Sequence, residues 1–161
     1  MRVLSAALTL YYLAASLFVW FNDAELRSYQ SAWEWFLLPG IAVVLVVGIR
    51  ILAARMEDRP GWLNLPDKAR FLALPAERQR PVLQHTRSLV EWIALDVTII
   101  MGLIQLGLYY QRGEDGFNAF LVAGLAYALL VSPIVMFVHI SRIQSEVTRQ
   151  TREHAAEENP G

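Results

Sequence analysis

Apolar residues along this chain are grouped into four long runs and do not alternate with polar residues at a regular spacing. The runs cover residues 3–21, 35–54, 92–110 and 117–138. Each run is roughly 19 to 22 residues long, which is the length that a helix needs to cross about 30 Å of hydrocarbon. The sequence therefore predicts four membrane-spanning helices.

Helices of a soluble bundle are the alternative interpretation, and they would show a polar face at helical spacing. The second run has no such face, because residues 41–49 read Ile-Ala-Val-Val-Leu-Val-Val-Gly-Ile. The first run follows a lone basic residue, Arg2, and no small-residue cleavage site precedes Phe21, so we expect a retained span and not a signal peptide. The predicted fold is an all-α integral membrane four-helix bundle.

Basic residues outside the runs are distributed unequally between the two sides. Most of them lie near the N-terminus, in the loop 56–91 and after the fourth run, whereas the two other loops contain Arg27 and Arg112 among more acidic residues. Lys and Arg accumulate in cytoplasmic loops. We therefore expect an N-in/C-in topology with one larger cytoplasmic loop. Residues 1–150 would form a single four-span domain, and the polar residues 151–161 a flexible cytoplasmic tail.

The loop 56–91 contains signals for two further helices. Asp67 can cap a short helix that runs to Leu72 and rests on the lipid interface through Phe71 and Leu72. Pro75 is suited to the start of a second helix. Beyond Pro81 we expect this helix to continue unbroken into the third span.

The same loop carries a motif. It consists of Asn64, Leu65, Pro66, Asp67 and Lys68, followed by Phe71-Leu72-Ala73 and by Glu77 and Arg78. This pattern resembles the NLPNK-x-x-WLA-x-ER cytoplasmic loop of small four-span bacterial membrane proteins of unknown function, which are related to SdpI-type immunity proteins. The chain departs from that family in its first outer loop, where residues 21–34 contain no His or Pro and so lack the LP-x-x-IP-x-HF motif. The resemblance implies a bacterial inner (cytoplasmic) membrane protein with an immunity-like role.

Arg50, Asp96 and His139 form a predicted intramembrane polar cluster. Arg50 and Asp96 each lie five residues inside the cytoplasmic boundary, or about 7–8 Å at 1.5 Å per residue. Their equal depth favours an ion pair that fixes helix packing. A relay or ligand site is the functional alternative, because ionisable residues in spans are often functional. In a third possibility, Arg50 snorkels to the surface by itself.

Small and polar residues form one stripe on each of the last two spans. The stripe on the third span consists of Thr98, Gly102, Gln105 and Tyr109, and the stripe on the fourth consists of Gly124, Ala128 and Ser132. Such faces let helices approach closely and exchange hydrogen bonds in lipid. We expect the third and fourth spans to pack as a tight antiparallel hairpin along these stripes.

The composition argues against several kinds of chemistry and binding. The chain has no cysteine and a net charge of −1, which excludes thiol chemistry and gives no electrostatic case for nucleic-acid binding. His85 and His139 could suggest a bis-histidine haem, but His85 falls in a polar segment. We therefore expect no cofactor, no metal and no enzymatic activity.

The expected function is that of an accessory or structural subunit of a larger membrane complex, or of an immunity-like helper that acts by helix–helix contacts. Its partners would be the lipid bilayer and other membrane subunits. A small oligomeric transporter or channel that uses Arg50 and Asp96 is the alternative. An intramembrane enzyme with a site near Asp96 and His139 is a third.

Overall fold

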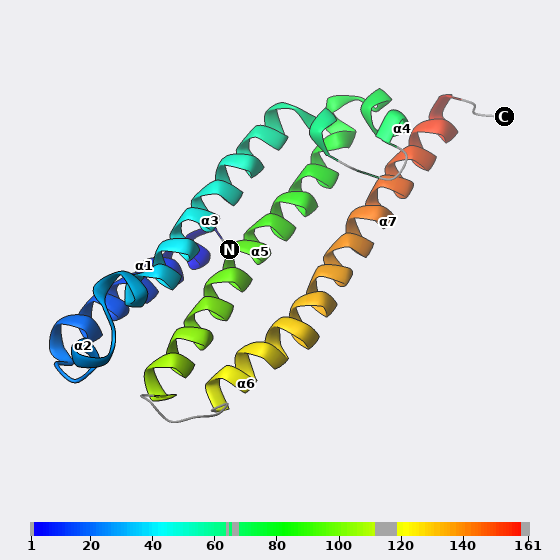
Figure 1. Ribbon diagram of the computed structural model, residues 1–161. Coiled ribbons are helices and arrows are strands. Elements are labelled where there is room, and N and C mark those ends of the chain that lie inside the picture. The colour runs from blue at the N-terminus through cyan, green and yellow to red at the C-terminus, as the bar shows by residue number, and fades with distance from the viewer. Residues whose placement is uncertain (1, 64, 66–67, 112–118, 159–161) are drawn as a thin grey trace.

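The computed structural model describes residues 2–63, 65, 68–111 and 119–158 (Figure 1). Helices α1 (Arg2–Asn22), α3 (Ala32–Asp58) and α5 (Ala76–Gln111) carry the first three apolar runs. The fourth rod consists of α6 (Ala119–Ala126), the π-helical turn η2 (Tyr127–Val131) and α7 (Ser132–Glu158). Short helices α2 (Leu26–Tyr29), η1 (Pro60–Trp62) and α4 (Lys68–Ala73) lie between the long ones.

Four of the described helical rods are long and apolar enough to cross a membrane. This finding confirms the predicted all-α bundle with four candidate spans. The second span begins earlier than predicted, because Ser31 and Glu34 form a capping box that starts α3 at Ala32.

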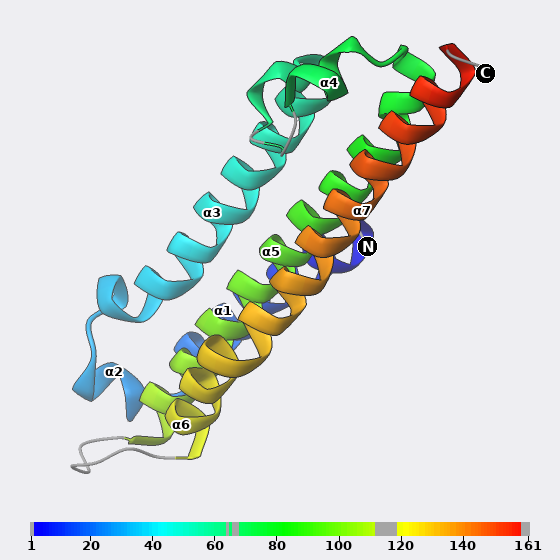
Figure 2. The same ribbon diagram turned by 90° about the vertical axis from the view of Figure 1, so that its right-hand side faces the viewer.

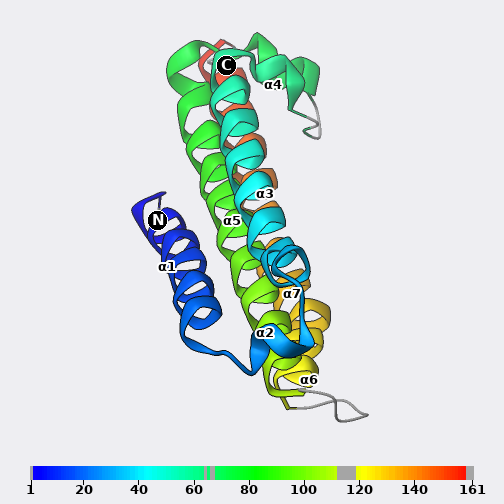
Figure 3. The ribbon, with the colours of Figure 1, turned by 60° about the vertical axis from the view of Figure 1, so that its left-hand side comes forward.

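Helix α5 lies at the centre of the bundle and packs against α1, α3, α6 and α7. Figures 1 and 2 show α3, α5 and α7 running alongside one another, and Figure 3 shows α1 on a further face of α5. The chain therefore has an α4 end, where α3, α5 and α7 extend beyond α1, and an α2 end, where α6 begins.

The bundle buries several polar side chains and exposes many large apolar ones, which is the opposite of the usual pattern in a soluble protein. Ser5 is 1% exposed and Gln105 5%, whereas Phe18, Val44 and Leu129 are 69%, 70% and 72% exposed. A hydrocarbon solvent accepts exposed apolar side chains, whereas polar groups in it need partners inside the protein. The surface of the four long helices thus matches a lipid environment.

The α4 end forms a small packed unit, called the cap here. Helix α5 has 36 residues, so it is about 54 Å long, whereas the hydrocarbon is only about 30 Å thick. Its first turns therefore extend past the span and pack with α4, η1 and the end of α7. The apolar core of the cap consists of Leu63, Phe71, Leu74, Val82, Ile143 and Val147.

Two predictions about this end need correction. Phe71 is fully buried in the cap and does not rest on the lipid interface, because α4 packs against α7 and η1. Residues 151–158 continue α7 and are not a loose tail. The helix is supported by the bonds of Arg149 to Glu146 and Glu153, one turn away on either side. The predicted unbroken helix from the loop into the third span is confirmed, since α5 begins at Ala76.

Candidate functional site

Polar side chains of α1 face α5 along almost the whole first span. Ser5, Thr9, Tyr12 and Ser16 follow one another at helical spacing, and the three smaller ones are buried. Residues spaced three and four apart lie on one helix face. This row and its partners on α3 and α5 are called the polar seam here. The spacing was visible in the sequence, but the prediction did not use it.

An ion pair lies at the end of the seam nearest to α4. Arg50 of α3 donates a hydrogen bond to Ser5 Oγ at 2.8 Å, and Ser5 donates to Glu91 Oε2 at 2.8 Å. Arg50 Nη2 also lies 3.5 Å from Glu91 Oε2. The side chain of Glu91 is 8% exposed and that of Arg50 is 33% exposed. Three helices are therefore joined by one charged and hydrogen-bonded group.

This arrangement gives Arg50 a different partner from the predicted one. Glu91 and Asp96 are five positions apart on α5, so their side chains point roughly 140° apart around the helix axis at about 100° per residue. Glu91 faces α1 and α3, whereas Asp96 accepts a hydrogen bond from Ser132 of α7. The prediction used equal depth alone, and depth does not specify the direction of a side chain.

The middle of the seam links α1 to α5 through hydroxyl groups. Thr9 and Thr98 share a hydrogen bond at 3.0 Å between their Oγ1 atoms. The Tyr12 hydroxyl donates to Gln105 Oε1, and Ser16 Oγ lies 3.5 Å from the same oxygen. Thr98 and Gln105 of the predicted third-span stripe therefore face α1 and not the fourth span.

Gln105 also supplies a hydrogen-bond donor that α3 lacks because of Pro39. Pro39 has no amide hydrogen, so the carbonyl of Trp35, four residues earlier, loses its helical donor. Gln105 Nε2 donates to this carbonyl at 3.3 Å. A buried carbonyl without a donor is costly in a membrane, so Gln105 allows the proline to remain inside the span.

Aromatic and acidic groups close the seam at the α2 end. Trp35 Nε1 donates to the backbone oxygen of Ser16 at 2.9 Å, and its ring lies 6.0 Å from that of Tyr109. The Tyr109 hydroxyl donates to Asp23 Oδ2 at 2.9 Å. The seam therefore runs from Glu91 near one end of the span to Asp23 at the other.

Asp96 belongs to a second polar group between α5 and the fourth rod. It accepts a hydrogen bond from the Ser132 hydroxyl. Ser132 directly follows the π-helical turn η2, and its amide bonds to the Tyr127 carbonyl at the start of that turn. Such turns are frequent at functional sites. His139, the third member of the predicted cluster, instead packs against Trp92, with ring centres 5.9 Å apart.

The close hairpin of the third and fourth spans uses one predicted glycine, Gly124, and one that was not predicted, Gly107. A Cβ at Gly107 would lie 2.4 Å from Leu121 Cγ, and one at Gly124 would lie 3.3 Å from Leu103 Cβ. A Cβ at Gly102 would meet nothing within 4 Å. Gly124 is therefore at the contact as predicted, Gly107 replaces Gly102, and Ala128 is partly buried beside it in η2.

A cleft of about 600 Å³ lies beside the seam between α1 and α5. Its walls are mostly apolar and include Leu8, Gly102, Leu103 and Leu106. The seam residues Tyr12, Ser16, Thr98 and Gln105 form one side of it. Because these polar groups already bond to one another, the cleft presents a largely apolar interior.

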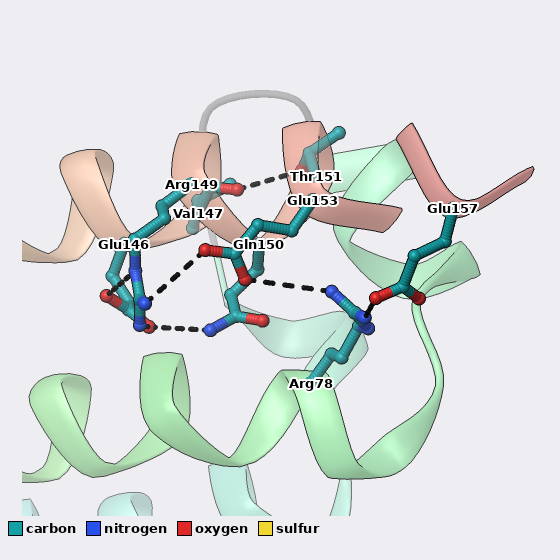
Figure 4. Close-up of polar contacts among 8 residues, drawn as sticks. All are labelled: Arg78, Glu146, Val147, Arg149, Gln150, Thr151, Glu153 and Glu157. Carbon is teal, nitrogen blue, oxygen red and sulfur yellow. Dashed lines mark hydrogen bonds and ion pairs between the residues drawn. The ribbon is translucent and has the colours of Figure 1, made fainter. Parts of the chain in front are cut away.

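The loop motif lies partly within the described residues. Asn64, Pro66 and Asp67 fall outside them. Leu65 packs against the core of the cap, and Lys68 begins α4. Glu77 is exposed in the first turn of α5. Arg78 reaches α7, where it pairs with Glu157 and lies 3.7 Å from Glu153 (Figure 4).

These features define a class of protein but no family. No protein family, no curated protein and no solved structure matches this chain. Among the residues described, no group of three or more His, Asp or Glu side chains is placed to hold a metal ion. The chain is a multi-pass membrane protein in which polar side chains join the four long helices.

Proposed function

We propose that this chain is a non-enzymatic accessory subunit of a larger membrane complex, acting through helix–helix contacts. One observation carries the proposal: the polar side chains inside the spans bond to one another across the chain's own helices. Arg50 and Glu91 join α3 to α5, Gln105 joins α5 to α1 and α3, and Asp96 joins α5 to the fourth rod.

Hydrogen bonds of this kind hold helices together in lipid, where the hydrophobic effect between helices is absent. The polar groups therefore act as a scaffold, and the outer faces of the helices are free to contact a partner. The fourth rod is the best candidate face, because it packs on α5 and exposes Leu129, Ile134 and Phe137. The loop resemblance makes an immunity-like helper one form of this role.

The proposed setting is the inner membrane of a bacterium with the cap in the cytoplasm. Basic residues at the α4 end support this orientation, among them Arg55, Lys68 and Arg80, since positive loops stay inside. The chain has no native cysteine, so single cysteines can report topology. A cysteine at exposed Arg80 should resist an impermeant thiol reagent in intact cells, and one at exposed Tyr29 should react. The reverse pattern would overturn the orientation.

A small oligomeric transporter is the alternative function, and it would need Arg50 and Asp96 to share one passage. Their partners lie on different helices: Glu91 and Ser5 for Arg50, and Ser132 for Asp96. These separate contacts favour the subunit proposal.

The test is extraction of the tagged chain in a mild detergent, followed by native electrophoresis and identification of any bound protein. Single cysteines at Leu129 and Phe137 on the fourth rod would be compared with Phe18 on α1 and Val44 on α3, which are similarly exposed. The proposal expects one partner band, cross-linked from the fourth rod and absent from the control faces. A chain that migrates alone after every extraction, with no cross-link from any face, would refute it.

A further inference from the structure

The cleft between α1 and α5 has the length of one membrane leaflet. Its lining runs from Leu8 to Val19 on α1 and from Thr98 to Tyr110 on α5. At 1.5 Å per residue these segments are about 17 Å long. Half of the hydrocarbon core of a bilayer is about 15 Å thick. The cleft therefore reaches from the membrane centre to the interface at the α2 end.

The cleft opens sideways toward the lipid. Tyr11, Leu106 and Tyr110 line it and are 72%, 44% and 58% exposed. Water would form few hydrogen bonds inside, because the seam side chains in the wall are already bonded and the rest of the lining is mostly apolar. An apolar molecule that enters from the bilayer is the occupant that this lining suits.

We propose that this cleft binds one acyl chain of a lipid from the leaflet at the α2 end. The cleft volume of about 600 Å³ lies within the roughly 300–1,000 Å³ of small-ligand pockets.

The orientation of the chain follows from the two ends of the cleft. Its inner end is near Leu8 and Ile99, whose apolar side chains suit the methyl end of an acyl chain. Its outer end is near Tyr109 and Tyr110, and tyrosines of this kind lie at the level of lipid head groups. The acyl chain therefore enters with its polar group beside the tyrosines.

Gly102 provides a direct test, because it lines the cleft and a Cβ there would meet nothing within 4 Å. Gly102→Phe places a ring in the cleft without displacing a neighbour at Cβ. Gly48→Phe on α3 is the matched control, since its Cβ is equally unobstructed and Gly48 is exposed and does not line the cleft. Ala15→Phe fills the same space from the α1 wall and replaces Gly102→Phe if that variant fails to fold.

The experiment uses the full chain in phosphatidylcholine nanodiscs that contain stearic acid with a photoreactive diazirine near its methyl end. After irradiation, mass spectrometry locates the label. We expect it on Leu8 and Ile99 in the unaltered chain and in Gly48→Phe, with most of this label lost in Gly102→Phe. Equal labelling in all variants, or label spread evenly over every lipid-facing helix, would overturn the proposal. A disulfide-linked dimer of Leu106→Cys would also overturn it, because a second copy would then cover the cleft.

Discussion

Replacing Arg50 should destabilise the bundle more than replacing Glu91, although the two residues form one pair. The side chain of Glu91 is 8% exposed, whereas that of Arg50 is 33% exposed and long enough to turn toward the surface. Arg50→Leu removes the guanidinium beside a buried carboxylate, which still accepts the bond from Ser5. Glu91→Leu leaves a guanidinium that can reach water.

The different exposure of Arg50 and Glu91 sets the unfolding free energy that each variant is expected to lose. Loss of one partner from a fully buried ion pair costs about 3–5 kcal/mol. Because Ser5 still donates to Glu91, we expect Arg50→Leu to cost about 3 kcal/mol of unfolding free energy, at the low end of that range. Glu91→Leu should cost about 1 kcal/mol, since Arg50 is partly solvated. The double replacement removes both charges and should recover most of the loss.

The assay is reversible unfolding in mixed micelles as the fraction of sodium dodecyl sulfate rises, followed by tryptophan fluorescence. A second cycle pairs Arg50→Leu with Asp96→Leu. Because Arg50 and Asp96 bond to different helices, their effects should add to within about 0.5 kcal/mol. The reasoning fails if Arg50→Leu is the milder single variant, or if the Arg50 and Asp96 effects are coupled while those of Arg50 and Glu91 are additive.

Three further predictions concern other contacts, each measured by the same unfolding assay unless stated. Gln105→Leu should cost about 1 kcal/mol, and less in a Pro39→Ala background, because the new amide can bond to the freed carbonyl that Gln105 otherwise satisfies. Gly107→Ala should cost about 1–3 kcal/mol by overpacking against Leu121. Phe71→Ala should cost the cap about 3 kcal/mol, seen as faster hydrogen exchange in α4 and at the end of α7 with the spans unchanged.

Each of these predictions has a matched control. A Gln105→Leu cost that is unchanged by Pro39→Ala would show that the carbonyl bond contributes nothing. Gly102→Ala should be neutral or slightly stabilising, because its Cβ meets no neighbour within 4 Å, and a loss equal to that of Gly107→Ala would contradict the packing argument. Arg78→Ala loses exposed ion pairs to α7 and should cost less than about 1 kcal/mol. If Arg78→Ala cost more unfolding free energy than Phe71→Ala, ion pairs and not apolar packing would be the main source of the cap's stability.

The sequence predicted the helices of this protein because the signals for them are local. Four apolar runs of membrane-spanning length gave four helical rods, and Pro75 marked the start of α5. The polar stripe from Ser5 to Ser16 could also have been read from its spacing. The helical residues 151–158 were missed because their charges and alanines resemble a disordered tail in composition, while the ion pairs of Arg78 with Glu153 and Glu157 depend on the fold.

The tertiary structure alone decided which helix each polar face contacts. The depth of Arg50 was misjudged as well, because Arg50 lies level with Glu91, which is five residues or about 7–8 Å before Asp96 on α5. The direction of a side chain around the axis advances by about 100° per residue, and α5 has neighbours on several sides. No local sequence pattern predicts whether Gln105 faces α1 or the fourth rod, or whether Arg50 forms an ion pair with Glu91 or with Asp96. Those choices depend on the rotation of each helix, which is set by the packing of all the others.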